Sequence, residues 1–110
     1  MSVKIISNNI TMTRGDTLKT KINIMDANGN EYIPVEGDYI RFAVKRKYTD
    51  TTCCIIKEIP IDTLVLHLTP EDTKQMPQPC ECVYDIQITM NDGTVDTFLT
   101  GKLTIMQEVE

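Results

Sequence analysis

This chain is poor in the residues on which several classes of function depend. It has no Trp, two Phe, four Tyr and a single His among its 110 residues. Eleven Lys and Arg stand against sixteen Asp and Glu, which gives a net charge of −5. Nucleic-acid binding relies on Lys and Arg that neutralise phosphates, so this balance argues against a nucleic-acid partner. The only basic run, Lys45, Arg46 and Lys47, is interpreted as a solvated strand end.

Long hydrophobic runs are also missing. No stretch approaches the roughly 18 apolar residues of a membrane-spanning helix. The opening residues, MSVKIISNN, lack the apolar region of a secretory signal. We therefore expect a protein that is made inside a cell, is not exported and has no membrane partner.

The composition that remains is that of an ordinary soluble domain. Apolar residues make up 41% of the chain and charged residues 25%, both typical of globular proteins. A chain of 110 residues can bury one hydrophobic core but is too short for two. We expect a single domain over residues 1–110.

The strongest local signal is a long β-hairpin over residues 80–106. Asp92-Gly93 is favoured in a type I′ turn, which needs positive φ at both central positions. Strand residues alternate between two faces, so the residues paired across this turn would share one face of the hairpin, the core face. The predicted pairs are Met90–Val95, Ile88–Thr97, Ile86–Leu99, Tyr84–Gly101, Cys82–Leu103 and Cys80–Ile105. The solvated face would carry Glu81, Asp85, Gln87, Asp96 and Lys102.

The rest of the chain reads as short strands separated by turn residues. Thr69 followed by Pro70 and two acids predicts a helix start, and Pro77 and Pro79 would end this helix near Met76. The expected strands are Val3–Ile6, Ile10–Met12, Thr17–Met25, Tyr39–Lys45, Cys53–Ile59 and Leu64–Leu68, followed by the hairpin. The pattern predicts an all-β fold, an antiparallel immunoglobulin-like β-sandwich of seven to eight strands with one short helical turn near residues 70–76.

Four cysteines leave reduced thiols, disulfides and a metal site open. Zinc ligands are usually spaced Cys-x2–4-Cys, whereas the adjacent Cys53 and Cys54 would point to opposite faces of a strand. Cys80 and Cys82 share the predicted core face, where a thiol behaves as a small hydrophobe. Synthesis inside a cell favours reduced thiols, so we expect buried free thiols, no metal and no cofactor.

Other short motifs have ordinary explanations. Arg14-Gly15-Asp16 spells an integrin-recognition tripeptide, but it recurs by chance and is interpreted as a tight turn. Asn9-Ile10-Thr11 is a glycosylation sequon, which has no meaning in a chain that is not exported. Asp26, Asn28 and Asn30 begin like a calcium loop, which lacks here the later glycine and glutamate that calcium loops need.

Catalytic residues cannot be assembled from this sequence. His67 alternates outward from Leu66 and Leu68, and no serine or cysteine is recognisably paired with it. No glycine-rich phosphate loop is present. We expect no enzyme and predict no catalytic, cofactor-binding or metal-ligating residues.

Several segments in order resemble a recurrent phage pattern. They are ITMTRGDTLKTKINI, GDYIRFAVKRK, LTPEDTKQM and YDIQITMNDGTVDTFLTGKLTIMQEV. Together they resemble the small immunoglobulin-like domains of phage tail and baseplate proteins, in particular the amino-terminal domain of baseplate upper proteins of phages of Gram-positive bacteria. Ahead of the YDIQ strand, where that family tends to have a glycine and a tyrosine, this sequence has Pro79-Cys80-Glu81-Cys82.

The resemblance implies a virion structural protein. It would be a tail or baseplate adaptor of a phage or prophage, made in the cytoplasm of the bacterial host and located in the virion. Its partners would be other virion proteins, and it would form a homo-oligomer or part of a larger assembly. Two alternatives remain open: a carbohydrate- or cell-surface-binding module, weakened by the few aromatic residues, and a small cysteine-based metal-binding or redox protein.

Overall fold

The chain is described by a computed structural model at residues 4–6, 9–25, 29–51, 53–75 and 80–106. These residues form eight strands and one short helix. The strands are β1 (Lys4–Ile6), β2 (Asn9–Thr13), β3 (Leu18–Lys21), β4 (Tyr39–Lys45), β5 (Ile55–Ile59), β6 (Val65–Leu68), β7 (Cys80–Thr89) and β8 (Val95–Met106). The helix, α1, spans Pro70–Lys74.

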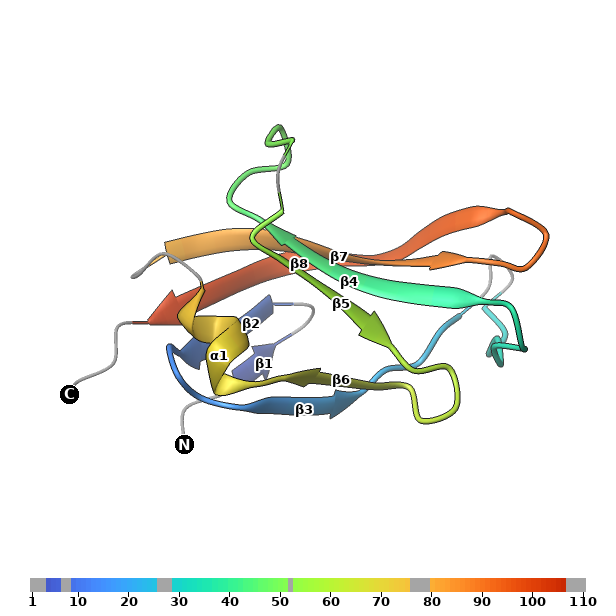
Figure 1. Ribbon diagram of the computed structural model, residues 1–110, viewed down its shortest axis with the longest axis horizontal. Coiled ribbons are helices and arrows are strands. Elements are labelled where there is room, and N and C mark those ends of the chain that lie inside the picture. The colour runs from blue at the N-terminus through green and yellow to red at the C-terminus, as the bar shows by residue number, and fades with distance from the viewer. Residues whose placement is uncertain (1–3, 7–8, 26–28, 52, 76–79, 107–110) are drawn as a thin grey trace.

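The strands form two sheets that pack face to face (Figure 1). The large sheet has six strands in the order β1-β2-β8-β7-β4-β5, and the small sheet pairs β3 with β6. The neighbours β8, β7 and β4 in one sheet, with β3 and β6 in the other, match the strand arrangement of immunoglobulin-like sandwiches. The all-β sandwich predicted from the sequence is confirmed.

One pairing departs from the expected antiparallel pattern. β2 runs parallel to β8, with Ile10 opposite Leu103 and Met12 opposite Ile105. β1 pairs antiparallel with β2, and the chain then leaves β2 through a turn into β3 of the small sheet. Because this pairing joins the two ends of the chain, local alternation could not reveal its direction.

The core lies between the two sheets. Ile40, Phe42 and Val44 of β4 are fully buried, as their alternation predicted. The Phe42 and Tyr84 rings pack with centroids 5.3 Å apart. Leu18, Leu66 and Leu68 of the small sheet join the same cluster from the other side. A single apolar cluster therefore holds both sheets.

The hairpin follows the predicted register in the half that is away from its turn, from Cys80 to Ile86. Ile86 lies opposite Leu99, Tyr84 opposite Gly101, Cys82 opposite Leu103 and Cys80 opposite Ile105. Of the predicted inward residues here, Cys82, Tyr84, Ile86, Leu103 and Ile105 are buried, while Leu99 is half-buried.

The half of the hairpin next to the turn differs from the prediction. The register shifts between Ile86 and Gln87, so that Gln87 pairs with Thr97 and Phe98 is left over as a bulge. The pairs Met90–Val95 and Ile88–Thr97 were therefore wrong: Val95 pairs with Thr89, and Ile88 faces Asp96. An offset of one residue exchanges the two faces of a strand, which explains why Val95 and Thr97 are exposed and Asp96 faces the side expected to be core.

The turn itself has three residues rather than two. The amide of Met90 donates to the Thr94 carbonyl over 2.7 Å, and the amide of Gly93 donates to the Met90 carbonyl over 2.9 Å. Gly93 has a φ of +92°, but Asp92 does not have positive φ, as a type I′ turn would require. A three-residue loop with glycine in the left-handed position is the next most common hairpin turn, and the bulge at Phe98 offsets its extra residue.

The remaining elements are close to their predicted bounds, except that β3 ends at Lys21 and does not reach Met25 as predicted. α1 begins at the Thr69 cap, with a reciprocal capping box between Thr69 and Asp72, and it ends at Lys74 with Gln75 as the C-cap, two residues before the predicted end near Met76. β5 begins at Ile55, after the two cysteines that the prediction placed in the strand. No helix in the described part of the chain is long and apolar enough to cross a membrane.

Candidate functional site

The outer face of the large sheet is the most distinctive surface of the protein. In Figure 1 the small sheet and α1 lie on one side of β4, β7 and β8, and only the connection from β4 to β5 projects on the other. Outward residues of neighbouring strands form rows: Ile56, Ala43 and Asp85 make one row, and Tyr39, Thr89 and Val95 make another. This surface, the outer face, exposes 59% of Ile56, 55% of Val95 and 42% of Tyr39.

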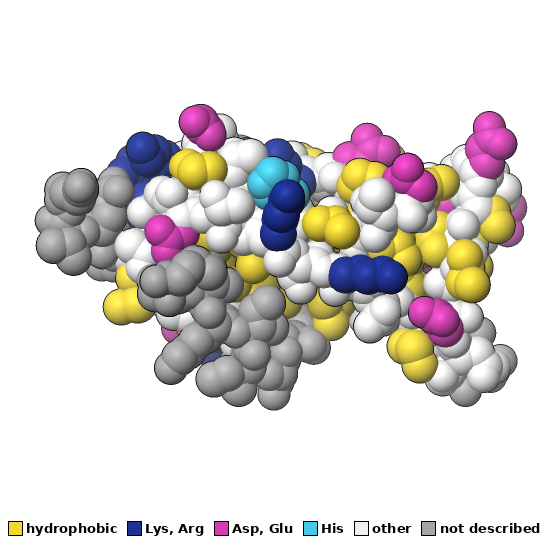
Figure 2. Space-filling model, turned by 90° about the horizontal axis from the view of Figure 1, so that it is seen from below, with side chains coloured by type: hydrophobic (Ala, Val, Ile, Leu, Met, Phe, Trp, Pro, Cys, Tyr) yellow, Lys and Arg dark blue, Asp and Glu magenta, His cyan; other side chains and the backbone are white. Residues whose placement is uncertain are grey.

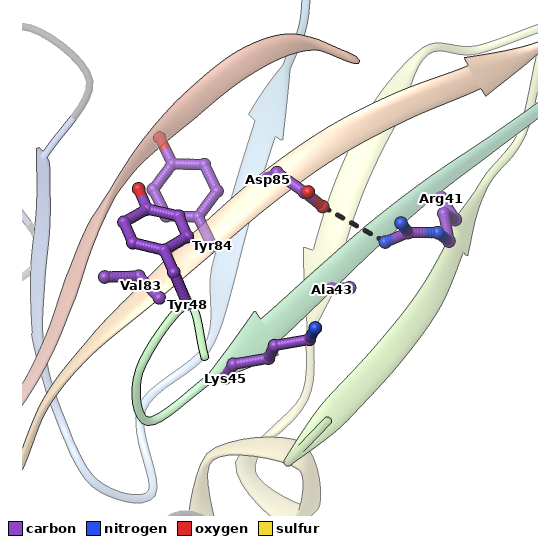
Figure 3. A pocket seen from close by; sticks show the side chains of 7 residues that line it. All are labelled: Arg41, Ala43, Lys45, Tyr48, Val83, Tyr84 and Asp85. Carbon is purple, nitrogen blue, oxygen red and sulfur yellow. Dashed lines mark hydrogen bonds and ion pairs between the residues drawn. The ribbon is translucent and has the colours of Figure 1, made fainter. Parts of the chain in front are cut away.

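A shallow hollow of about 170 Å³ opens on the outer face (Figure 3). Its lining comprises Arg41, Ala43, Lys45, Tyr48, Val83, Tyr84 and Asp85. Ala43 is only 4% exposed although it points outward, because longer side chains surround it. Tyr48, from the β4–β5 connection, is 62% exposed and stands at the rim.

Charged and aromatic groups meet in this hollow. Arg41 Nη1 donates to Asp85 Oδ1 over 3.1 Å, an ion pair across β4 and β7. Within the described part of the chain Lys45 makes no ion pair. Burial raises the pKa of the Tyr84 hydroxyl, and the charge of Tyr48 raises it further.

The hollow suits a side chain of a partner better than a small-molecule ligand. Pockets for drug-sized ligands enclose roughly 300–1,000 Å³ and bury most of the ligand. This hollow is smaller and open, and it is bordered by exposed apolar and charged residues. Such a mixture is typical of protein contact surfaces.

A buried carboxylate organises the far end of the sandwich, where the hairpin turn meets the segment before β4. Asp38 is 8% exposed and accepts hydrogen bonds from the Tyr32 hydroxyl over 2.6 Å and from the Val35 and Asn91 amides over 3.0 Å each. The Tyr32 bond and then the Val35 bond hold the pKa of Asp38 below its ordinary value. The hydrogen bond between Tyr32 and Asp38 also raises the pKa of Tyr32, and burial raises it further.

The Arg14-Gly15-Asp16 segment forms the predicted turn and is anchored to the helix. The Asp16 amide donates to the Thr13 carbonyl over 3.0 Å, and Gly15 has a φ of +90°. The Gly15 amide donates to the buried Thr73 Oγ1 over 2.9 Å, and Arg14 Nη2 donates to the Lys74 carbonyl over 3.1 Å. The tripeptide therefore has a structural role in joining the β2–β3 turn to α1.

The cysteines do not gather into a site among the described residues. Cys82 is 1% exposed on the inner side of β7, while Cys53 and Cys54 are half-buried before β5. The side chain of Cys80 lies outside the described residues. No three His, Cys, Asp or Glu side chains are grouped so as to hold a metal in the part of the chain described here.

The other predicted positions are scattered. His67 is exposed on the small sheet, as its alternation predicted. Asn9 of the sequon lies in β2, and its side chain accepts a hydrogen bond from the Lys102 amide over 3.2 Å. Asp26 and Asn28 of the calcium-like segment are outside the described residues. Lys45 was interpreted as a solvated strand end but is half-buried in the hollow.

No protein-family model matches this chain, and no curated protein matches it significantly. The outer face was not recognised from the sequence. The sequence contained one indication of this surface: Ile56 and Tyr48 are large apolar residues that lie outside the positions predicted to face the core. Their grouping beside Ala43 depends on pairing between β4 and β5, which the sequence pattern does not specify.

Proposed function

We propose that this protein is a non-enzymatic structural component of a phage or prophage virion, a tail or baseplate adaptor that acts through protein–protein contacts at its outer face. The observation that carries the proposal is a set of large apolar side chains, those of Ile56, Tyr39 and Val95, exposed on one open sheet face together with Tyr48. The resemblance of the sequence to phage tail and baseplate domains supports the virion location and the partners, other virion proteins.

The composition of the outer face supports a protein partner. Aromatic residues and arginine are enriched at protein interfaces, because aromatic rings supply a large, rigid contact area and the guanidinium group makes directed hydrogen bonds. Tyr39, Tyr48 and Arg41 are half-buried or exposed on this surface. A partner that covered them would remove apolar area from water, the main favourable contribution to association.

The outer face is a better contact surface than the β5 edge of the large sheet. β5 is one of the two edge strands of this sheet, and Lys57 points inward from it between the buried Ile55 and Ile59. Lys57 Nζ lies 2.9 Å from Asp72 Oδ2 of α1. An inward-pointing charge on an edge strand opposes pairing with a further strand. We therefore place the contact on the outer face.

Co-purification of virion proteins tests the proposal. Tagged wild-type chain, expressed in a host that carries the phage or prophage, should capture tail or baseplate proteins identified by mass spectrometry. Ile56→Asp should lose them, because it places a charge among the exposed apolar side chains of the outer face. His67→Asp is the matched control, since it places the same side chain on an exposed strand position of the opposite sheet.

The two variants must both retain the thermal unfolding transition of the wild type. The proposal is contradicted if no virion protein is captured, or if Ile56→Asp captures as much as His67→Asp.

One observation favours the carbohydrate- or cell-surface-binding alternative. Tyr48 is a highly exposed aromatic ring beside a hollow that also offers Arg41 and Asp85. An aromatic face with adjacent polar groups could hold a sugar ring. Glycan binding that is lost in Tyr48→Ala and kept in His67→Asp would support this alternative against the assembly role.

A further inference from the structure

One end of the sandwich carries acidic charge only. The described segments 29–39 and 89–98 contain no Lys or Arg, and four of their carboxylates are exposed, those of Glu31, Glu36, Asp92 and Asp96. We call this end the acidic tip. In Figure 2 the acidic and hydrophobic side chains gather at the right-hand end of the molecule, with no Lys or Arg among them there.

The acidic tip is held in shape by internal contacts. Asp38 links the two segments through the Asn91 amide, and Asn91 Nδ2 donates to the Glu36 carbonyl over 3.3 Å. A methyl group at Gly37 would come within 2.7 Å of the Asn91 Cβ, which shows how closely the segments approach. A preordered surface loses little conformational freedom on binding.

The acidic tip also exposes apolar side chains. Ile33 is 73% exposed, Val35 51% and Val95 55%. These residues give the tip a hydrophobic contribution to binding in addition to its charge.

The opposite sign of charge lies beside the hollow. Lys45, Arg46 and Lys47 follow one another at the end of β4, next to the exposed Tyr48. We call these four residues the basic rim. It combines cations with an exposed apolar group, as the acidic tip combines carboxylates with apolar groups. The two surfaces are therefore complementary in charge, and each of them also exposes apolar side chains.

We propose that the acidic tip of one copy of this chain docks on the basic rim of a second copy, in a head-to-tail contact. This inference rests on the proposed assembly function and names a partner for the same outer face. Copies with a net charge of −5 repel one another at random orientations, and contacts of tip with tip or rim with rim bring like charges together. Tip against rim joins opposite charges.

A head-to-tail contact has a consequence for the assembly. The two contacting surfaces differ, so each copy keeps one of each available after the first contact. Such heterologous contacts generate a ring when the rotation between copies closes and an open filament when it does not.

The small sheet supplies a second basic surface and thereby a control. Lys19, Lys21 and His67 are exposed there, and Figure 2 shows the histidine beside Lys or Arg side chains. The described residues of β3 and β6 expose no large hydrophobic side chain. Charge alone is thus available on the small sheet, whereas charge and apolar area coincide at the basic rim.

Charge reversal on each surface, followed by mixing, tests the contact. Lys45→Glu with Lys47→Glu reverses the rim, and Glu36→Lys with Asp96→Lys reverses the tip. Asp92 is left unchanged, because its carboxylate accepts a hydrogen bond from the Thr94 amide in the hairpin turn. Lys19→Glu with Lys21→Glu is the control with the same change of charge as the rim variant.

Sedimentation velocity at low ionic strength measures the association. We expect the wild type and the control to self-associate, and added salt to weaken this association. The rim variant and the tip variant should each associate more than about tenfold more weakly, because like charges then face each other. An equal mixture of the two variants should associate again, since each tip then meets a rim of opposite charge.

The inference is overturned if the mixture stays monomeric, if either reversed variant associates like the wild type, or if the control loses association to the same extent. It is also overturned if the wild type is monomeric at low salt. Capture of virion proteins through Ile56 in any of these cases leaves the proposed function standing, whereas monomeric protein without a virion partner contradicts both. Equal thermal unfolding transitions show that all variants are folded.

Discussion

At the scale of single residues, Asp38 shows how one polar group fixes a surface. It accepts hydrogen bonds from Tyr32, Val35 and Asn91, which come from three separate positions along the chain. A buried carboxylate without such donors would be costly, and with them it stays ionised. The acidic tip is therefore built around a carboxylate that is itself withdrawn from solvent.

Replacing this carboxylate should lower stability in a pH-dependent way. Asp38→Asn should reduce the free energy of unfolding at pH 7 by about 1–3 kcal/mol, because charge-assisted hydrogen bonds are weakened and one amide loses its acceptor. The pKa of Asp38 is lower in the folded protein. Its charge-linked stabilisation is thus complete above about pH 4, the pKa of an unfolded aspartate, and is lost as the pH falls through the folded pKa.

Urea denaturation of wild type and variant at pH 7 and at decreasing pH measures this difference. The difference should shrink as the solution becomes more acidic. Asp96→Asn changes an exposed aspartate in the same way and is the control, which should change stability by less than about 0.5 kcal/mol at pH 7. A difference for Asp38→Asn that is unchanged in acid would contradict the ionised, hydrogen-bonded carboxylate.

At the scale of elements, the hairpin of β7 and β8 combines two registers. On the side of the Phe98 bulge away from the turn, the inner face of the hairpin packs in the core. Between the bulge and the turn, β8 presents Val95 and Thr97 outward. The side chain of Thr97 accepts a hydrogen bond from Gln87 Nε2 over 3.2 Å, which confirms that these two residues share the outer face. The bulge is what brings Val95 to the outer face.

Two truncations on this hairpin should differ sharply in their cost. Ile86→Ala should lower the free energy of unfolding by about 2–5 kcal/mol, because Ile86 is 1% exposed and its loss leaves a cavity. Val95→Ala should change it by less than about 0.5 kcal/mol, since the predicted inward position of Val95 is in fact an exposed one. Chemical denaturation of both variants measures the two costs, and similar values would contradict the shift of register.

At the scale of the whole molecule, one core joins two sheets of unequal size. The small sheet has two strands and packs on one side of the six-stranded sheet, so the outer face on the other side is left without a covering sheet. Residues at the core, such as Cys82, are reached only when the sheets separate. Chemical access to the core is therefore a measure of global opening.

Thiol titration measures this access and the oxidation state together. In denaturant, freshly prepared protein should react at all four of its cysteines. In the native protein Cys82 should react much more slowly than the half-buried Cys53, because it is 1% exposed within the core. Reaction at two or fewer thiols in denaturant would indicate a disulfide or a bound metal and would favour the cysteine-based function.

The local features of this protein follow from residues that are close together in the sequence. Alternation placed Ile40, Phe42 and Val44 inward because period two is imposed by the extended backbone. The Thr69 cap fixed the start of α1 through contacts within four residues of chain. These features rest on neighbours in the sequence.

Three features depend on contacts between distant parts of the chain: the parallel pairing of β2 with β8, the bulge at Phe98 and the grouping of the outer face. Each depends on strands that meet only after the chain has folded, and the turn after Met90 shows the reason. Asp92-Gly93 suits both a two-residue and a three-residue turn, and the packing of Ile86 and Ile88 in the core, with the bulge at Phe98, accommodates the longer one. The position of Val95 on the outer face follows from the longer turn and the bulge, because the resulting register shift of one residue moves Val95 from the predicted core face to the outside.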